Sequence, residues 1–175
     1  MIPTLTTERL RLRPLREGDL DAFVAFYASP ASAFYGGACD RADAWRRMAS
    51  YAGSWVLKGF GPFAVESRAA GEFLGMVGPW APEGWPEPEI TWMLLSRAQG
   101  KGYATEAAGA ALDFAYRRLG WPTAVSAINP DNTPSLRLAE RLGACFAYET
   151  VIRGGEGVHV YRHRAPQTRR AGGKQ

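Results

Sequence analysis

The sequence predicts a single domain of the α/β class with mixed α+β character, in which a mostly antiparallel sheet of about seven strands carries about four helices. Three observations predict this fold. The first half of the chain holds short alternating apolar and polar runs joined by turns, which is typical of antiparallel strands. The second half alternates strand-like and helix-like segments, which is typical of β-α-β units. The length, 175 residues, fits one domain.

The N-terminal half is expected to supply strands and two helices. Residues 9–13 alternate with period two and indicate a strand with one buried face. Asp19 and Asp40 each precede an apolar helical pattern, and an aspartate oxygen there can cap the first free N–H groups. The expected segments are a strand at 9–13, a helix from Asp19 to before Pro30, a helix from near Asp40 to a break at 59–62, strands at 63–66 and 73–77, and a proline-rich loop at 78–88.

The C-terminal half is expected to alternate strands with helices before two final strands. The run at 89–95 is the most strand-like in the chain, because apolar and β-branched side chains dominate it. The expected segments are strands at 89–95 and 123–128, helices at 102–119 and 134–142, and strands at 144–151 and 158–164. Residues 1–165 are therefore predicted to form one domain.

The last ten residues, 166–175, are predicted to form a disordered basic tail. They hold Arg169, Arg170 and Lys174, so the rest of the chain has 18 basic against 17 acidic side chains. The body is therefore almost neutral and lacks a basic stripe with interleaved aromatics. We expect no nucleic-acid partner.

We also expect neither a membrane nor a metal partner. Uncharged stretches are too short to cross a bilayer, and the N-terminus has no apolar signal core, so a cytoplasmic location is predicted. His159 and His163 lie four apart on an expected strand, where such residues stand roughly 13 Å apart, too far to share a metal. Cys39 and Cys145 are interpreted as two reduced thiols, with Cys145 in a core strand.

The segment 93–107 carries the strongest chemical signal. A strand leads into a loop with glycines at 100 and 102, and a helix follows at once. Free N–H groups at a helix N-terminus and the helix dipole favour an anion, most naturally a phosphate or pyrophosphate. The alternative is a glycine-rich helix entry that only makes a tight turn. No GxxxxGK[ST] motif and no dinucleotide-binding GxGxxG context is present, which disfavours kinase, NTPase and dinucleotide readings.

Three motifs together resemble the GNAT superfamily of acetyltransferases. The run Gln99-Gly-Lys-Gly-Tyr-Ala-Thr-Glu-Ala107, preceded by Arg97, resembles its acetyl-CoA pyrophosphate loop. The segment 129–144, with Asn129, Asn132 and Ser135, resembles the N-x-x-N-x-x-S helix of the ribosomal-protein N-terminal acetyltransferase branch. Residues 5–14 are similar to the first strand of that branch. The resemblance spans about residues 5–164, in order.

The resemblance implies a sheet that is splayed at a central parallel pair of strands, with acetyl-CoA bound in the resulting V. Backbone groups of the strand before the loop would pair with the pantetheine arm, the loop amides would hold the pyrophosphate, and two asparagines would bind the arm and shape the site. The implied cofactor-binding residues are Trp92, Met93, Leu94, Gln99, Gly100, Lys101, Gly102, Tyr103, Ala104, Thr105, Asn129 and Asn132.

The residues at 129–135 also have a purely local interpretation. Asn-Pro-Asp-Asn is turn chemistry, and Asn132 or Thr133 can cap a helix with Pro134 in its first turn. In that alternative these residues only begin the helix. Ser135 lies within the first turn, where its hydroxyl could face the cofactor sulfur.

Amine attack on a thioester needs a base for the ammonium, a donor for the oxyanion and a proton for the leaving thiolate. Glu89 is the candidate base, since alternation places it on one strand face with Thr91 and Met93. The alternative is a solvated strand-end glutamate, with Glu66 and Glu72 as rival bases. By resemblance, the oxyanion donor is a backbone N–H near Leu94 and Ser135 is the proton donor.

The predicted function is transfer of an acetyl group from acetyl-CoA to a primary amine, for which a protein N-terminus is one candidate, by direct attack in a ternary complex. The alternatives are a small-molecule amine acceptor (an aminoglycoside, polyamine or amino acid) and a catalytically silent CoA-binding sensor. A monomer and a homodimer both remain open. Four aromatic residues are expected to border the acceptor site: Phe34, Tyr35, Trp80 and Trp85. The alternative for any one of them is packing in the core.

Overall fold

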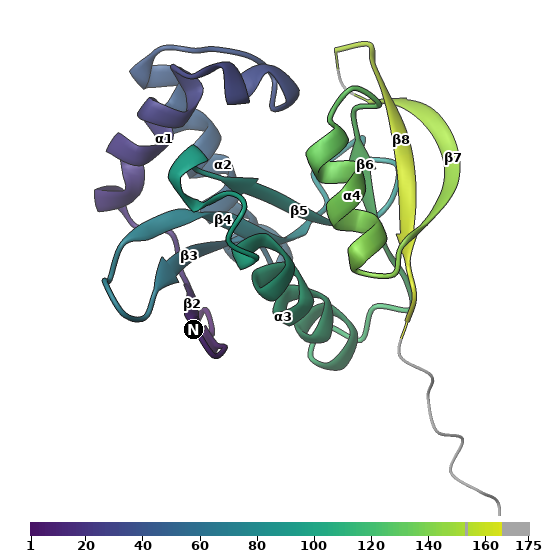
Figure 1. The fold of residues 1–175 in the computed structure, drawn as a ribbon, viewed down its shortest axis with the longest axis horizontal. Coiled ribbons are helices and arrows are strands. Elements are labelled where there is room, and N and C mark those ends of the chain that lie inside the picture. Colours follow the sequence, from purple (N-terminus) through teal and green to yellow (C-terminus); the bar gives the residue numbers. More distant parts are fainter. Residues whose placement is uncertain (153, 166–175) are drawn as a thin grey trace, which may run out of the picture.

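The structure, a computed structural model, describes residues 1–152 and 154–165. The tail predicted at 166–175 lies outside the described residues. One eight-stranded sheet runs through the molecule in the order β1-β2-β3-β4-β5-β6-β8-β7 (Figure 1). Every neighbouring pair is antiparallel except β5 and β6, which are parallel. The mixed, mostly antiparallel fold is confirmed, and the strand beyond the expected seven is the two-residue β1.

The helices and strands follow the expected order. The strands are β1 Leu5–Thr6, β2 Leu10–Arg13, β3 Phe63–Ser67, β4 Phe73–Trp80, β5 Glu89–Leu94, β6 Ala124–Ile128, β7 Cys145–Ile152 and β8 Glu156–His163. The helices are α1 Leu20–Tyr27, α2 Arg41–Lys58, α3 Tyr103–Arg117 and α4 Thr133–Arg141. Short 3₁₀ turns occupy Glu17–Asp19, Pro30–Phe34 and Ser96–Ala98.

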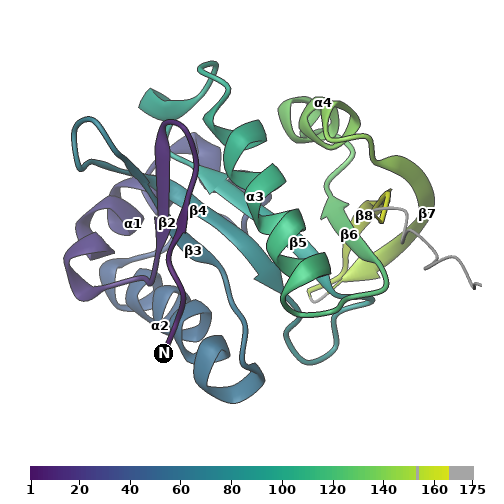
Figure 2. The same cartoon turned by 90° about the horizontal axis from the view of Figure 1, so that it is seen from below.

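Two hydrophobic cores cover the two faces of the sheet. Figure 2 shows α3 lying across one face, with α1 and α2 behind the sheet. The core on the α3 face includes Ile90 and Trp92 of β5 and continues to Leu138 of α4. The core on the other face joins α1 and α2 to strand residues that include Met93. Successive β5 side chains therefore point to opposite faces, as the pleat requires.

The parallel pair β5–β6 is the point where the sheet divides. Glu89 and Val125 are its only registered partners, and Val125 N–H also donates to the Pro88 carbonyl (3.1 Å). Beyond this pair the strands diverge, and the Ser126 hydroxyl reaches across to the Ile90 carbonyl (2.7 Å). The splayed parallel pair implied by the resemblance is present.

The predicted loop at 78–88 begins later than expected, because β4 continues through Pro79 to Trp80. Pro79 pairs with Ile90 of β5, whereas the β3 partners of β4 end at Val77. Proline lacks an N–H and is tolerated where one side of a strand has no partner. Pro79 therefore lies in β4 where the strand has no β3 partner, and the other three prolines of this segment lie in the loop.

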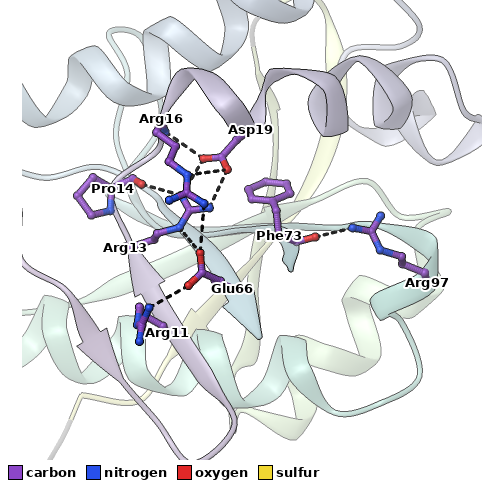
Figure 3. A network of polar contacts seen from close by, with 8 residues as sticks. All are labelled: Arg11, Arg13, Pro14, Arg16, Asp19, Glu66, Phe73 and Arg97. Carbon is purple, nitrogen blue, oxygen red and sulfur yellow. Dashed lines mark hydrogen bonds and ion pairs between the residues drawn. The ribbon is translucent and has the colours of Figure 1, made fainter. Parts of the chain in front are cut away.

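Asp19 does not cap α1 with its side chain, contrary to the sequence prediction. Its carboxylate instead receives two hydrogen bonds from the buried Arg13 guanidinium, at 2.8 and 2.7 Å. Arg13 also donates to Glu66 (2.7 Å), which links β2, β3 and the start of α1 (Figure 3). The carboxylates, Asp19 foremost, raise the pKa of Arg13 against the opposing effect of burial. A buried cation needs such partners, and this need outweighs the weaker capping bond.

Cys145 was placed in a core strand, and this is wrong. It lies on β7, which forms the edge of the sheet, and its side chain is exposed. An alternating pattern alone cannot tell an edge strand from a covered one. The two cysteines are free thiols.

Candidate active site

Two cavities meet on the surface of β5. The larger, of about 830 Å³, runs along the glycine loop and the N-terminus of α3. The smaller, of about 320 Å³, lies between the β5–β6 divide and the connection from α1 to α2. We call them the loop cavity and the aromatic cavity. Five residues line both and so form their shared wall: Phe34, Tyr35, Trp92, Asn132 and Ser135.

The glycine loop has the geometry of an anion site at the start of α3. Gly100 (φ 73°) and Gly102 (φ 78°) adopt left-handed backbone conformations, and Gly102 is the residue before the helix. A Cβ on Gly102 would stand 3.3 Å from Arg9 Nη2, a close contact that the arginine side chain would have to relieve by shifting. The free N–H groups of the first helical turn remain available to a ligand.

Most of the residues predicted for the loop line the loop cavity. They are Gln99, Gly100, Gly102, Tyr103, Ala104 and Thr105. Lys101 is exposed and does not line the cavity, although its carbonyl faces back toward β2. Lys101 therefore lies at the rim of the loop cavity, between Gly100 and Gly102, which line it.

Arg9, which the sequence analysis did not assign to the site, braces this loop. Its Nη1 donates to the Lys101 carbonyl (2.9 Å) and its Nε to Glu106 (2.7 Å), while its guanidinium stacks 4.7 Å from the centre of the Tyr103 ring. Arg9 and Glu106 are 97 positions apart, so no local pattern could have joined them. The contact ties the N-terminal strands to the glycine loop.

The strand before the loop presents alternate residues to the loop cavity. Trp92 and Leu94 line it, whereas Met93 points to the opposite face and is buried against α1 and α2. The Leu94 carbonyl already accepts a hydrogen bond from Gln99 Nε2 (3.0 Å). A ligand that used this carbonyl would have to share it with Gln99.

Ser135 and Asn132 begin α4 at the shared wall. Asn132 caps the helix, since its Oδ1 accepts from Ser135 N–H (3.3 Å), so its amide nitrogen is the group left for a ligand. Ser135 is 7 % exposed, and its Oγ accepts a hydrogen bond from Trp92 Nε1 (3.1 Å). That bond occupies an oxygen lone pair and leaves the hydroxyl proton free to be donated.

Asn129 lies on the other side of the wall from the loop cavity. It lines only the aromatic cavity, and its Nδ2 donates to Glu156 (3.1 Å). Its Oδ1 also accepts from the Asp131 N–H (2.9 Å), which is the turn contact expected from the sequence. Its proposed role is therefore to shape the turn that connects β6 to α4.

Glu89 is a buried carboxyl group in the aromatic cavity, with only 4 % of its surface exposed. Burial raises its pKa to about 7, although the Ala127 N–H and the side chains of Trp85 and Thr91 favour the carboxylate and lower the pKa in part. Its Oε2 accepts from the Ala127 N–H of β6 at 3.0 Å, across the divide between the strands. A carboxyl group with this pKa can accept a proton near neutral pH.

The rival carboxylates lie elsewhere. Glu66 is buried in the ion-pair network with Arg13 and also binds Arg11 (3.1 Å) (Figure 3). Glu72 is exposed at the turn before β4. Neither lines either cavity.

Aromatic side chains form much of the smaller cavity. The four expected residues, Phe34, Tyr35, Trp80 and Trp85, all line it. Tyr51 and Arg47 of α2 also line it and were missed. The Tyr51 and Trp80 rings lie 4.7 Å apart between centroids. The four-residue spacing of Arg47 and Tyr51 places them on one helix face, but the sequence does not reveal that a cavity adjoins it.

The two histidines do not share a site. His163 is buried, and burial lowers its pKa to about 4, while its Nε2 lies 2.9 Å from the Ser126 hydroxyl. His159 instead lies beside Glu149 (3.3 Å). Among the described residues, no cluster of His, Cys, Asp and Glu side chains could hold a metal ion. Nor does the described part of the chain include a helix long and apolar enough to span a bilayer.

Comparisons with known proteins agree with this arrangement. The sequence profile of the acetyltransferase (GNAT) domain matches residues 9–144. A crystal structure of an acetyltransferase from Agrobacterium tumefaciens superposes with a TM-score of 0.86 at 37% identity, covering 94% of this chain and 95% of that one. The uncharacterized protein YkkB of Bacillus subtilis is 29% identical over 172 residues, covering 92% of this chain and 95% of its own length.

A more distant structure shares only the fold. It is a ribosomal L7/L12 α-N-protein acetyltransferase in complex with coenzyme A, which is 15% identical with a TM-score of 0.74 and covers 93% of this chain and 98% of that one. The match to the domain profile spans well over half of the chain. Together with the glycine loop and the divided sheet, it places the chain in the GNAT family of acetyltransferases.

Proposed function

We propose that this protein transfers an acetyl group from acetyl-CoA to a primary amine, by direct attack of the amine in a ternary complex. The observation that carries the proposal is the meeting of two cavities at Ser135, with Glu89 in one of them. One cavity suits a long ligand with a phosphate end, and the other brings a carboxyl group toward the shared wall. Residues 1–165 would form the whole catalytic domain.

The loop cavity would hold acetyl-CoA. The amides from Gln99 to Ala104 and the start of α3 suit its pyrophosphate, with Lys101 at the rim and Thr105 nearby. The β5 backbone from Trp92 to Leu94 and the Asn132 amide would bind the pantetheine arm. Acetyl-CoA supplies the thioester that the amine attacks.

Glu89 in the aromatic cavity and Ser135 in the shared wall would carry out the proton transfers. Glu89 would accept the proton that the ammonium must lose, since its raised pKa still leaves a usable fraction ionised at neutral pH. As the new C–N bond forms and the C–S bond breaks, Ser135 would donate a proton to the departing sulfur. Overall, the ammonium nitrogen loses two protons as it becomes an amide. Glu89 takes one and passes it to solvent, and the other replaces the proton that Ser135 gives to the thiolate.

Two classes of amine are candidates for the acceptor. Membership of the ribosomal-protein N-terminal acetyltransferase branch, and hence a protein N-terminus as acceptor, rests on the resemblance of residues 5–14 and 129–144. A small-molecule amine is the second candidate, and the observation that favours it is the modest volume of the aromatic cavity, about 320 Å³. Both acceptors would place their amine beside Glu89.

A turnover screen tests the proposal. Acetyl-CoA would be offered with peptide N-termini, polyamines, amino acids and aminoglycosides, while release of free CoA thiol and the mass of the acceptor are followed. We expect acetylation of at least one class. Tight CoA binding without transfer to any class would instead identify a catalytically silent CoA sensor.

Ser135→Ala is expected to lower kcat by roughly 10-fold to 10²-fold with little change in CoA affinity, because a positioned proton donor is lost but a CoA thiol leaves fairly well. The buried Trp92 N–H also loses its acceptor, which costs about 1–3 kcal/mol of stability. Steady-state kinetics at saturating acceptor checks the rate.

Ser54→Ala is the matched control for this change. Ser54 is also buried and hydrogen-bonded, to the Phe60 carbonyl (2.8 Å), but it lines neither cavity. It should lose stability and keep its kcat. If Ser135→Ala has the wild-type kcat when chemistry limits the rate, Ser135 has no part in the proton transfer.

A further inference from the structure

The segment at residues 34–37 contributes to the shared wall. Phe34 and Tyr35 line both cavities, and Gly36 (φ 83°) and Gly37 (φ 74°) follow them in left-handed conformations. The backbone N–H groups of Tyr35 and Gly37 both donate to the Ser32 carbonyl, at 2.8 and 3.0 Å. Two glycines in succession give this segment little stiffness of its own.

A single guanidinium binds three successive carbonyls of this segment. Arg47 Nη1 donates to the Tyr35 carbonyl (3.0 Å) and the Gly37 carbonyl (3.1 Å), and Nη2 donates to the Gly36 carbonyl (3.0 Å). The same guanidinium stacks on the Tyr27 ring at 4.5 Å. Within the described residues, Arg47 has no carboxylate within 4.0 Å. The hydrogen bonds of the Arg47 guanidinium therefore go to the backbone of residues 35–37.

We propose that Arg47 is a positioning residue for the transfer reaction: it clamps residues 35–37 so that the Tyr35 side chain stays in the wall beside Ser135 and Asn132. This inference rests on the proposed acetyl transfer. The proposed role of Arg47 is to hold the backbone of residues 35–37, and the residue also lines the aromatic cavity.

Tyr35 is the group through which the clamp would act. Its ring packs edge-on against Phe26 at 5.3 Å between centroids, and it lines both cavities together with Ser135 and Asn132. Burial raises the pKa of Tyr35 to about 12, although the side chains of Ser135 and Asn132 lower it in part, so the phenol keeps its proton at neutral pH. A shift of the backbone at residue 35 would displace the Cα from which this ring and its hydroxyl extend.

Only an arginine fits this clamp. Its planar fork presents several N–H groups in fixed directions, whereas a lysine ammonium is a single compact centre that cannot span three carbonyls in the same way. A Cβ on Gly36 would lie 3.3 Å from Arg47 Nη1, so the guanidinium sits directly against the segment. Displacement of a reacting group by about 1 Å can cost ~10²-fold in rate.

The test compares Arg47→Lys with Arg46→Lys. Arg46 is the neighbouring residue on α2, is exposed, and pairs with Asp43 of the same helix, so its replacement is a matched control. We expect Arg47→Lys to lower kcat by about 10-fold to 10²-fold while KM for acetyl-CoA changes less than about 3-fold. Arg46→Lys should match wild type in both constants.

Two further measurements separate positioning from general loss of structure. A double-mutant cycle with Tyr35→Phe should be non-additive, because Arg47 acts through the Tyr35 side chain. Hydrogen exchange by mass spectrometry should show faster exchange in the peptide that covers residues 34–37 in Arg47→Lys, and unchanged exchange in Arg46→Lys.

The outcomes distinguish this inference from the proposed function. If wild-type protein acetylates no amine, the proposed function fails, and the exchange data alone decide whether the clamp exists. If wild type is active and Arg47→Lys keeps its kcat, the positioning role is overturned. Strictly additive effects of Arg47→Lys and Tyr35→Phe would also overturn it.

Discussion

Glu89→Gln is expected to lower kcat/KM for the acceptor amine by ~10²–10⁴-fold near neutral pH, the range typical of a lost general base. Glutamine keeps the size and the hydrogen bond from Ala127 but cannot take up a proton. Glu89 can act as a base only when its carboxyl group is ionised, and its raised pKa of about 7 sets the pH at which this happens. Wild-type kcat/KM should therefore rise with pH through about 7, and this step should be absent from the variant.

Rising pH should partly restore the variant, since free amine then needs no base. The pH–rate profile of folded Glu89→Gln on the true acceptor is the measurement. Glu72→Gln is the control, because Glu72 is exposed and lies outside both cavities. A Glu89→Gln profile identical to wild type would mean that the proton goes to bulk water or to another group.

The second large effect is expected at the glycine loop, where Gly102→Val should weaken CoA binding by about 10²-fold, equivalent to roughly 3 kcal/mol. Gly102 has φ 78°, a conformation that a β-branched residue adopts only with strain. Its Cβ would also lie 3.3 Å from Arg9, and its methyl groups would occupy the path by which a phosphate approaches the loop. Isothermal titration calorimetry with CoA measures the change.

Gly120→Val separates the loss of a binding surface from backbone strain. Gly120 follows α3 at its other end, has φ 69°, and would have open space around a Cβ. It should lose a similar amount of stability and bind CoA normally. Equal CoA affinity in folded Gly102→Val and wild type would show that the pyrophosphate binds elsewhere.

Much of the fold could be predicted because its signals are local. Asp40 caps α2 through the Asp43 N–H (2.8 Å), and Gly59 ends that helix in a left-handed conformation, as the sequence pattern indicates. The glycine loop and the Asn132 cap are equally local, since each lies within a few residues of the helix it begins. Helix ends have few solutions, and short motifs encode them.

The contacts that depended on distant partners could not be predicted. Asp19 has the sequence context of a cap, but a buried Arg13 takes its carboxylate. Arg47 is an ordinary helical arginine in the sequence, and only the fold brings it to the carbonyls of 35–37. Glu89 was recognised from its place on a strand. Its raised pKa, however, depends on burial that the sequence does not encode locally.

The divide between β5 and β6 separates the sheet into two parts. One part carries Glu89 and the glycine loop, and the other carries Ser135 on α4. The registered residue pair Glu89–Val125 joins the sheet between them. The hydrogen bond from the Ala127 N–H to Glu89 crosses this divide. An N–H bond to a carboxylate is stronger than one to a neutral carboxyl group. Each proton that Glu89 accepts therefore weakens this bond between β5 and β6, and each proton that it releases strengthens the bond again.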